Sequence, residues 1–417
     1  MSGFDTELSQ RLEVIRGQGL YRELRRIDSP QSARIQLQGK SLLNFSSNDY
    51  LGLANEPALK AAAIEAIDRF GAGAGASRLI CGSLAPHHEL DEALAGFKGT
   101  NAAISFSTGY AAALGVIGAL LGKDDIIIID KLVHACIVDA ARLSGARLRV
   151  FAHNDLNDLE DILKWTEKTR SAQAELHAPK QRPHVLIVTE SVFSMDGDHA
   201  PLRELVELKD KHEAWLMVDE AHATGLYGAN RRGLAEALGV GNRIEIQMGT
   251  LGKALGASGG YLCGSRALID FLINRARTFI FSTAPVPAAA AAATAGIRFV
   301  QSSAGEDRRN LLWQRVAALP SSLAPRSSSQ ATVHSPLPGA IIPIPIGDEA
   351  KAVATAAALR DRGLYIPAIR YPTVARGQAR LRLTLTAAHT PEDISQLLAA
   401  FGSHDLGLWT TDSAPSL

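Results

Sequence analysis

Cysteine is scarce in this chain, and the three that occur lie far apart. Cys81, Cys136 and Cys263 form no C-x-x-C pair. An odd number of widely spaced cysteines argues against a disulfide framework and against a zinc site built on paired cysteines. The cysteine pattern therefore predicts a protein of a reducing compartment, and we expect it to be cytoplasmic.

The chain also lacks net charge and long apolar runs. Its 43 lysines and arginines balance 43 aspartates and glutamates, so no general field attracts nucleic acid or an anionic membrane. The first residues show no apolar stretch typical of a secretory signal. The longest run of small apolar residues, 286–297, is too short to cross a bilayer. We therefore expect no nucleic-acid partner and no membrane segment.

The length of 417 residues allows a large domain and a smaller one. Between residues 102 and 263, short apolar runs alternate with helical stretches, which is typical of a mostly parallel sheet covered by helices. We predict an α/β fold with an N-terminal helix and strands over 1–48 and a large domain over 49–285. A smaller α+β domain over 286–417 would end in a disordered tail. The strands predicted in the large domain are 126–130, 184–190, 214–220, 244–250 and 259–264.

Helix periodicity, prolines at first helical positions and glycines at ends predict the remaining elements. The predicted helices span 6–26, 57–71, 287–301, 348–363 and 391–401. The predicted strands outside the large sheet are a hairpin over 34–45, followed by 340–346, 365–368 and 379–386. A polar, serine-rich connector is expected around 320–338.

Three motif matches fail on their context. GAGAGA at 71–76 resembles a dinucleotide fingerprint but follows a helix rather than a strand. Ser258 matches G-x-S-x-G, yet a strand follows it where a nucleophile elbow needs a helix. His87 and His88 have no third ligand nearby in the sequence, so we predict surface histidines and no metal site.

Lys253 lies in a glycine-rich loop, GTLGKALGASGG, just after a predicted strand. Glycines leave room for a bulky planar ligand, and a Schiff-base lysine needs an amine pKa lowered by burial and neighbours. Thr250 is placed to bond a phosphate. A lysine in such a loop is more often structural, so this interpretation depends on the other elements of the pattern.

A second group of polar residues fits the same ligand. Asp219 ends a predicted strand, and His222 follows three residues later. A carboxylate that faces a pyridine nitrogen keeps it protonated, and a nearby histidine can bond the phenolic oxygen of the ring. Taken alone, Asp219 could equally cap the next helix. The turn at 106–110 precedes an alanine-rich helix whose first N–H groups could hold a phosphate, and His134 could stack on a ring. Together these features predict pyridoxal 5′-phosphate (PLP) as the cofactor.

Four motifs make the chain similar to a known family, the α-oxoamine synthases, which are fold-type-I PLP enzymes. The similarity covers about residues 20–389. It is carried by NFSSNDYLGL (44–53), ESVFSMDGDHAPL (190–202), VDEAHATGLYG (218–228) and GTLGKALG (249–256). The resemblance implies a transferase with two domains that acts as a homodimer with a shared active site.

The resemblance also implies roles for individual residues. Lys253 would bind the cofactor aldehyde, Asp219 the ring nitrogen and His222 the ring oxygen. His134 would stack on the ring, and Ser194 would lie beside the cofactor. The phosphate would be held by a set made of Gly109, Tyr110 and Thr250, together with Ser282 and Thr283, which would reach the phosphate of the partner subunit.

Within the family, the segment AIRYPTVARGQARLRLTLTAAHT (368–390) is most similar to the branch that joins L-alanine to a pimeloyl thioester in biotin biosynthesis, delivered as pimeloyl-CoA or pimeloyl-ACP. Arg370 would bind the alanine carboxylate, because a guanidinium fork suits a carboxylate. Arg22 and Asn48 would lie near the acyl substrate and the carboxylate. Gln378 is shared with the glycine-using branch, 2-amino-3-ketobutyrate CoA ligase. That ligase and other α-oxoamine synthases stay open as alternatives. A non-catalytic PLP-binding regulator is disfavoured by the absence of a basic stripe.

Overall fold

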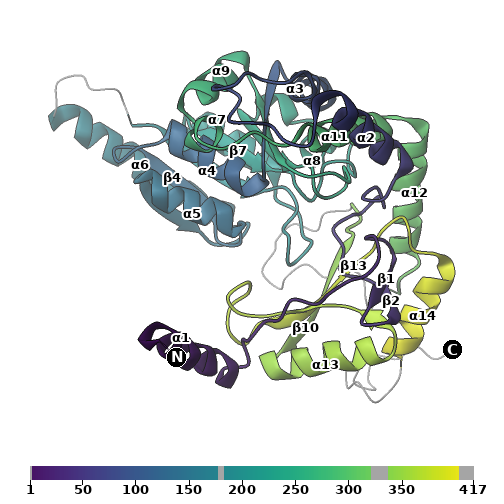
Figure 1. The fold of residues 1–417 in the computed structure, drawn as a ribbon. Coiled ribbons are helices and arrows are strands. Elements are labelled where there is room, and N and C mark those ends of the chain that lie inside the picture. The colour runs from purple at the N-terminus through teal and green to yellow at the C-terminus, as the bar shows by residue number, and fades with distance from the viewer. Residues whose placement is uncertain (1, 177–182, 321–336, 403–417) are drawn as a thin grey trace.

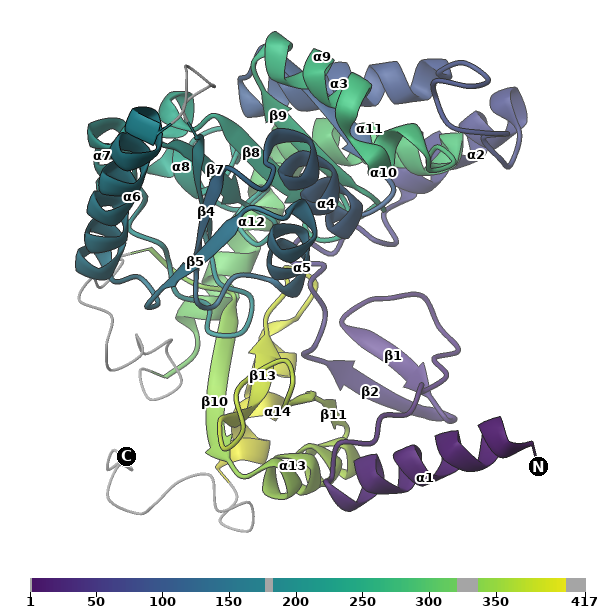
Figure 2. The same cartoon turned by 90° about the vertical axis from the view of Figure 1, so that its left-hand side faces the viewer.

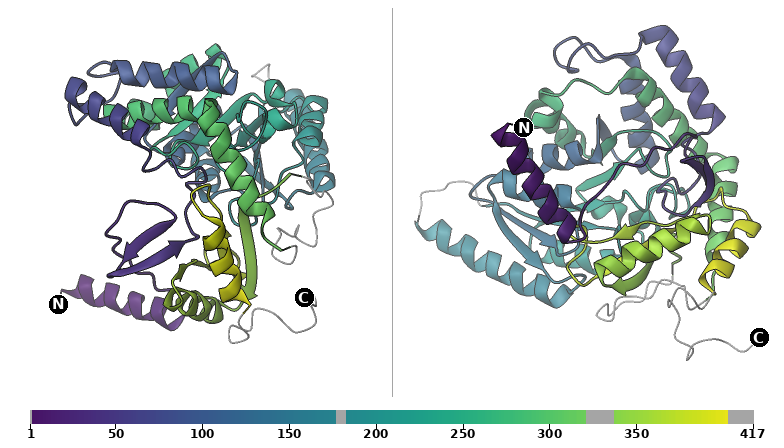
Figure 3. Two further views of the ribbon diagram at one scale, coloured as in Figure 1. Left: turned by 90° about the vertical axis from the view of Figure 1, so that its right-hand side faces the viewer. Right: turned by 60° about the horizontal axis from the view of Figure 1, so that its bottom comes forward.

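The computed structural model describes residues 2–176, 183–320 and 337–402. An upper body holds the large sheet and its helices, and a lower body holds two small sheets (Figure 1). Helix α12 (Ser303–Ala317) and strand β10 (Ile341–Gly347) run between the two bodies (Figures 2 and 3). Among the described residues, no helix combines the length and the apolar content needed to span a bilayer.

The large sheet has seven strands in the order β3-β9-β8-β7-β6-β4-β5. Neighbouring strands are parallel except for β9, which runs antiparallel to β3 and β8. The strands are β3 (Ala102–Phe106), β4 (Ile126–Asp130), β5 (Arg147–Phe151), β6 (Val185–Glu190), β7 (Trp215–Asp219), β8 (Ile246–Thr250) and β9 (Gly260–Gly264). The predicted mostly parallel sheet is confirmed. β5 was not predicted because it is an edge strand with exposed arginines, and β3 was not predicted because it is rich in alanine, a residue typical of helices.

Each face of the sheet has its own core, because successive side chains of a strand point to opposite sides. Ile127 and Ile129 of β4 pack in one core, and Ile126 and Ile128 pack in the other. The first core is covered by α4 (Gly109–Leu120), α5 (Ala135–Ser144), α9 (Arg266–Arg275) and α10 (Arg277–Ile280). The second is covered by α2 (Pro57–Phe70), α3 (Ala85–Lys98), α6 (Leu156–Leu176), α7 (Leu202–Lys211), α8 (Leu234–Ala237) and α11 (Pro287–Gln301). A short 3-10 turn, η1 (Gly241–Arg243), precedes β8.

The lower body combines the two ends of the chain. One sheet has the order β10-β13-β12, with β12 (Ala368–Ile369) and β13 (Ala379–Thr384), and all its pairs are antiparallel. The other has the order β1-β2-β11, in which β2 pairs in parallel with β11. Its strands are β1 (Arg34–Leu37), β2 (Lys40–Asn44) and β11 (Leu364–Tyr365). Helices α13 (Glu349–Asp361) and α14 (Pro391–Phe401) complete this body. Gln38 and Gly39 have φ values of 51° and 77°, which a type I′ hairpin turn requires.

Three sequence-based predictions need correction. Helix α1 (Gly3–Gly17) ends well before residue 26, because Gly17 and Gly19 interrupt it and Gly19 takes a φ of 68°. Helix α12 was not predicted at all. His87 is buried, not a surface residue, and its Nε2–H donates to the Pro285 carbonyl at 2.7 Å.

The strand predicted over 365–368 is instead two short strands, β11 and β12, which belong to different sheets. Two expectations about motifs are confirmed, and two other predicted segments lie outside the described residues. Helix α2 precedes GAGAGA, and strand β9 follows Ser258, so neither motif has the context that its function needs. Most of the connector around 320–338 and all of the chain after residue 402 fall outside the described ranges.

Candidate active site

The predicted polar residues gather at the carboxyl ends of β6, β7 and β8, where ligands bind in parallel sheets. Glu190 and Asp219 end β6 and β7 as cross-strand partners. Lys253 follows β8 in a loop rich in glycine. The charges of Asp219 and Lys253 act on each other's pKa, which places both side chains in one site.

Lys253 belongs to a chain of three polar groups. Its Nζ lies 2.7 Å from His222 Nε2, and His222 Nδ1 lies 2.6 Å from the Tyr50 hydroxyl. Burial raises the pKa of Tyr50 to about 12, so the phenol keeps its proton and donates to His222. Burial and the charge of Lys253 hold the pKa of His222 well below its usual range. When the Lys253 amine is unprotonated, the neutral imidazole therefore carries its own proton on Nε2 and donates it to that amine.

The Lys253 amine is less basic than a free lysine. Burial lowers its pKa to about 8, against the opposing effect of Asp219 and Glu190. An amine with this pKa is partly unprotonated at neutral pH, as a nucleophile or a general base must be.

Two carboxyl groups share this site. Burial raises the pKa of Asp219, and the positive charge of Lys253 opposes that shift. Burial and the charge of Asp219 raise the pKa of Glu190 to about 8. Because like charges at neighbouring strand ends disfavour each other's ionisation, Asp219 keeps its charge more readily when Glu190 is protonated. From the sequence, Glu190 was expected at a polar strand end, but no individual role was predicted for it.

The predicted phosphate-binding residues lie together. Gly109 begins α4, whose N-terminal amides point out of the helix. A Cβ on Gly260 would approach the Gly109 nitrogen to 2.4 Å, so glycine at position 260 lets β9 pack directly on this helix end. A Cβ on Gly109 would lie 3.9 Å from Cβ of Thr250. The Thr250 hydroxyl donates to the Gly259 carbonyl at 2.9 Å. Tyr110 is partly exposed, and its hydroxyl bonds Asp139.

His134 is the N-cap residue of α5 and is exposed as a whole residue, although surrounding protein atoms partly desolvate its ring. Its Nδ1 accepts the Cys136 backbone N–H at 3.2 Å and lies 3.0 Å from the Cys136 sulfur. The charges of Asp219 and Lys253 act on its pKa, which burial lowers overall. His134 is therefore a neutral imidazole at the edge of the site, as a ring-stacking residue would be.

Arg382 is the main residue that the sequence reasoning missed. It is 4% exposed on β13, and it donates from Nε to the Ser194 carbonyl at 2.6 Å and from Nη1 to Asn48 Oδ1 at 3.0 Å. Its charge lowers the pKa of both Lys253 and His222. Within the described parts of the chain, its Nη2 has no partner with hydrogen-bond geometry. The guanidinium nevertheless lies close enough to the Tyr50 hydroxyl to lower the pKa of that group, against the effect of burial. An arginine inside an apolar strand was a signal in the sequence, since arginine is rarely buried unless it is paired.

Arg370 and Arg22 form a separate pair. Arg370 donates to the Tyr21 carbonyl at 2.6 Å, and Arg22 donates to the Tyr371 carbonyl at 3.0 Å. Burial and the nearby charge of Arg22 lower the pKa of Arg370. Ser282 and Thr283 lie in a loop beside Arg78 and Ser107, which precedes α4.

The donor set fits PLP. A half-buried amine, a buried carboxylate and a neutral histidine converge at the strand ends, and a helix N-terminus lies beside Thr250. The unpartnered Nη2 of Arg382 is a buried donor that calls for an anion, such as the carboxylate of an amino-acid substrate.

Known proteins that are similar to this chain include PLP-binding enzymes, in agreement with the PLP site described above. Residues 40–401 match the family aminotransferase class I and II. A serine palmitoyltransferase from S. paucimobilis with a bound PLP–myriocin aldimine superposes with a TM-score of 0.85 at 31% identity, covering 98% of this chain and 99% of that one. The chain therefore belongs to the aminotransferase class I and II family, and it is a fold-type-I, PLP-dependent α-oxoamine synthase.

Several curated relatives share the name of one enzyme, 8-amino-7-oxononanoate synthase. The 8-amino-7-oxononanoate synthase of Anaeromyxobacter dehalogenans is 47% identical over 392 residues, covering 94% of both chains. That of Geobacter sulfurreducens is 45% identical over 389 residues, covering 93% of this chain and 95% of the relative. A solved 8-amino-7-oxononanoate synthase from Francisella tularensis has a TM-score of 0.67 at 28% identity, covering 86% of this chain and 96% of that one.

Proposed function

We propose that this chain is an 8-amino-7-oxononanoate synthase, which condenses L-alanine with a pimeloyl thioester and releases CO2. The observation that carries the proposal is the convergence of Lys253, Asp219 and the unpartnered Nη2 of Arg382 at one site. The curated relatives at 44–47% identity support the same activity. A cytoplasmic location, without a nucleic-acid or membrane partner, remains our prediction from the sequence.

Each cofactor contact would come from a residue described above. Lys253 would bind PLP covalently, Asp219 would keep the ring nitrogen protonated, and His222 would donate from Nε2 to the ring oxygen. The phosphate would be held by Gly109, Tyr110 and Thr250 of one subunit, with Ser282 and Thr283 reaching the phosphate of the other subunit. When bound, PLP withdraws electrons from the substrate Cα and makes its proton acidic.

Arg382 would bind the alanine carboxylate through Nη2, with Asn48 and Ser194 holding the guanidinium in place. This replaces the assignment of that role to Arg370. The pair formed by Arg22 and Arg370 would instead face the anionic end of the acyl substrate, because two adjacent guanidinium groups favour an anion between them.

Lys253 would move the protons of the reaction. Its unprotonated amine, with a pKa of about 8, would take the Cα proton of alanine. A bond would then form from Cα to the thioester carbonyl carbon, and the thiol would leave. Loss of the carboxylate as CO2 would be followed by return of one proton to the same carbon. Arg382 would hold the carboxylate until that bond breaks.

A homodimer would complete the site. Exposed apolar side chains occur on α1 and beside the predicted shared loop, namely Phe4, Leu8, Leu12, Ile80, Phe281 and Val286. Helix α1 has no buried residue in the single chain and lies at the edge of the lower body (Figure 2). Exposed apolar surface of this kind marks a protein interface.

A product assay tests the proposed activity. The protein is loaded with PLP and incubated with pimeloyl-CoA plus L-alanine, or with acetyl-CoA plus glycine, and the product is identified by mass spectrometry. We expect 8-amino-7-oxononanoate from the first pair and little product from the second. Preference for acetyl-CoA and glycine would instead assign the chain to the ligase branch.

A further inference from the structure

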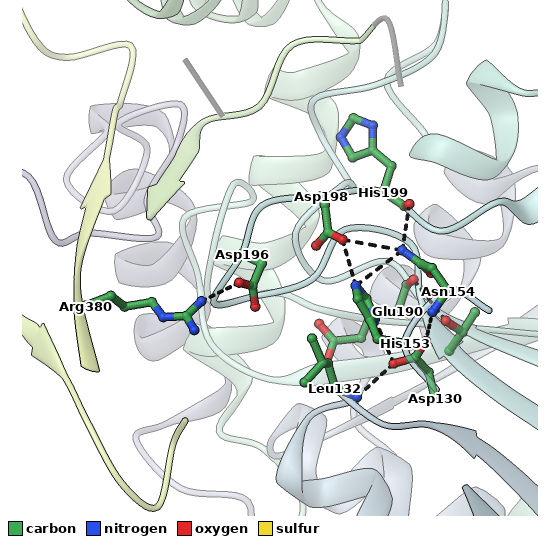
Figure 4. Close-up of polar contacts among 10 residues, drawn as sticks. Asp130, Leu132, His153, Asn154, Glu190, Asp196, Asp198, His199 and Arg380 are labelled. Carbon is green, nitrogen blue, oxygen red and sulfur yellow. Dashed lines mark hydrogen bonds and ion pairs between the residues drawn. The ribbon is translucent and has the colours of Figure 1, made fainter. Parts of the chain in front are cut away.

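We propose that His153 is a positioning residue that holds together the two loops that carry His134 and Ser194. These are the β4–α5 loop (131–134) and the β6–α7 loop (191–201). Figure 4 shows the His153 ring between Asp130, which precedes the first loop, and Asp198, which belongs to the second. The inference rests on the proposed function, because it concerns how that active site is kept in shape.

Both ring nitrogens of His153 are used. Nδ1 lies 3.0 Å from Asp130 Oδ1, and Nε2 lies 2.7 Å from Asp198 Oδ2. A carboxylate only accepts hydrogen bonds, so a ring bonded to two carboxylates needs a proton on each nitrogen. His153 is therefore an imidazolium, and the two hydrogen bonds with Asp130 and Asp198 raise its pKa to about 10, although burial opposes the shift.

The two aspartates fix backbone as well as charge. Asp130 accepts the N–H of Leu132 at 2.7 Å and the N–H of Asn154 at 2.9 Å, so it shapes the start of the loop that leads to His134. The amide of Asn154 reaches Asp198 Oδ2 at 3.4 Å and the His199 carbonyl at 3.2 Å. His153, Asp130 and Asp198 thus form a bridge of one cation between two anions. Each aspartate orders a different loop.

The β6–α7 loop is held from the other side by the lower body. Arg382 donates from Nε to the Ser194 carbonyl, and Arg380 of the same strand pairs with Asp196 (Figure 4). The ring of Phe193 packs edge-on against His153, with centroids 4.4 Å apart and an interplanar angle of 88°. Through this loop, a change at His153 reaches the guanidinium that is proposed to bind the substrate carboxylate.

A charge-balanced set of variants tests the bridge. His153→Gln removes the cation and leaves the fully buried carboxylate of Asp130 facing the largely buried carboxylate of Asp198, which is costly. His153→Gln combined with Asp198→Asn removes one of those carboxylates and restores the balance. His184→Gln is the matched control, since His184 stacks on Trp215 at the opposite end of β6.

Steady-state kinetics separate positioning from simple loss of folded protein. A lower folded fraction reduces the apparent kcat and leaves KM unchanged. A displaced Arg382 instead raises the KM for L-alanine, because carboxylate binding is lost. We expect His153→Gln to raise that KM about tenfold with kcat within about twofold, and the double variant to recover most of the loss.

Thermal unfolding of the cofactor-free protein gives a readout that needs no activity. The folded-state pKa of His153 is raised, so its stabilising effect is full below about pH 6.5 and is lost as pH rises through about 10. The charged groups that face the His153 ring are the carboxylates of Asp130 and Asp198. The difference in Tm between wild type and His153→Gln should therefore be largest near pH 6 and shrink toward pH 10.

The outcomes distinguish the two proposals. A wild-type KM for L-alanine in His153→Gln, or a double variant no better than the single one, would overturn the positioning role. A Tm difference that does not change with pH would contradict the charged bridge. An inactive wild type would instead count against the proposed function, while the unfolding experiment would still report on the bridge.

Discussion

Replacing Arg382 with lysine, and separately replacing Arg370 with lysine, tests which arginine binds the substrate carboxylate. Lysine keeps the positive charge but loses the planar fork, so the change removes the N–H groups that Nη2 of Arg382 would direct at the carboxylate. In Arg382→Lys the contacts from Nε to Ser194 and from Nη1 to Asn48 are also lost. Arg370→Lys disturbs only a contact to the Tyr21 carbonyl and the neighbouring Arg22.

The expected change in KM follows from the hydrogen bonds between the guanidinium and the carboxylate that the substitution removes. A hydrogen bond to a charged group contributes about 1.5–3 kcal/mol, which corresponds to roughly 10- to 150-fold in binding. We expect Arg382→Lys to raise the KM for L-alanine by this factor, with a much smaller change in the KM for pimeloyl-CoA. Arg370→Lys should show the reverse pattern. Visible absorbance of bound PLP is measured in both variants as a control, to check that the site is still formed.

The reasoning is refuted if Arg370→Lys raises the KM for L-alanine while Arg382→Lys leaves it unchanged. In that case the unpartnered Nη2 of Arg382 would serve only the packing of β13 against the β6–α7 loop, and the carboxylate would bind at the pair of Arg22 and Arg370.

Three further predictions address the lysine, the neighbouring carboxyl and the interface. Lys253→Ala should abolish turnover and the visible absorbance of lysine-bound PLP, and a variant that keeps both would remove Lys253 from its role. Glu190 has a folded pKa of about 8, above the ordinary value of 4.5, so it binds a proton more tightly when folded. Wild-type stability should therefore fall as pH rises from about 4.5 to 8, and Glu190→Gln should lose that fall in chemical denaturation. Phe281→Asp should shift the protein from two chains to one in light scattering, whereas the control Leu143→Asp, another exposed apolar residue, should not.

Much of the upper body could be predicted because the strands of a parallel sheet that is buried on both faces are continuous apolar runs in the sequence. β4 and β6 are apolar at almost every position and buried at every position. β5 does not form a continuous apolar run, because it is an edge strand and exposes Arg147 and Arg149. The end of α1 was misjudged because its apolar spacing continues past Gly17, although the backbone does not.

The candidate site was predicted where one motif contains a whole function, as with Lys253 and its glycines or Asp219 and His222. The residues missed from the site act through partners far away in the chain. Tyr50 contacts His222 across 172 positions, and Arg382 contacts Asn48 across 334. Spacing within a motif carries no information on such pairs, because only the assembled fold brings the two segments together.

The parallel pairing of β2 with β11 has a consequence for how the chain is made. Leu43 of β2 pairs with Leu364 of β11, which is synthesised more than 300 residues later. During synthesis, one edge of the N-terminal hairpin therefore stays unpaired until β11 has been made. Until then, the outer edge of β2 is an open row of backbone donors and acceptors, which is a template for pairing between chains. A nascent or truncated chain that stops before residue 364 is therefore expected to self-associate through this hairpin, even when its large sheet has already formed.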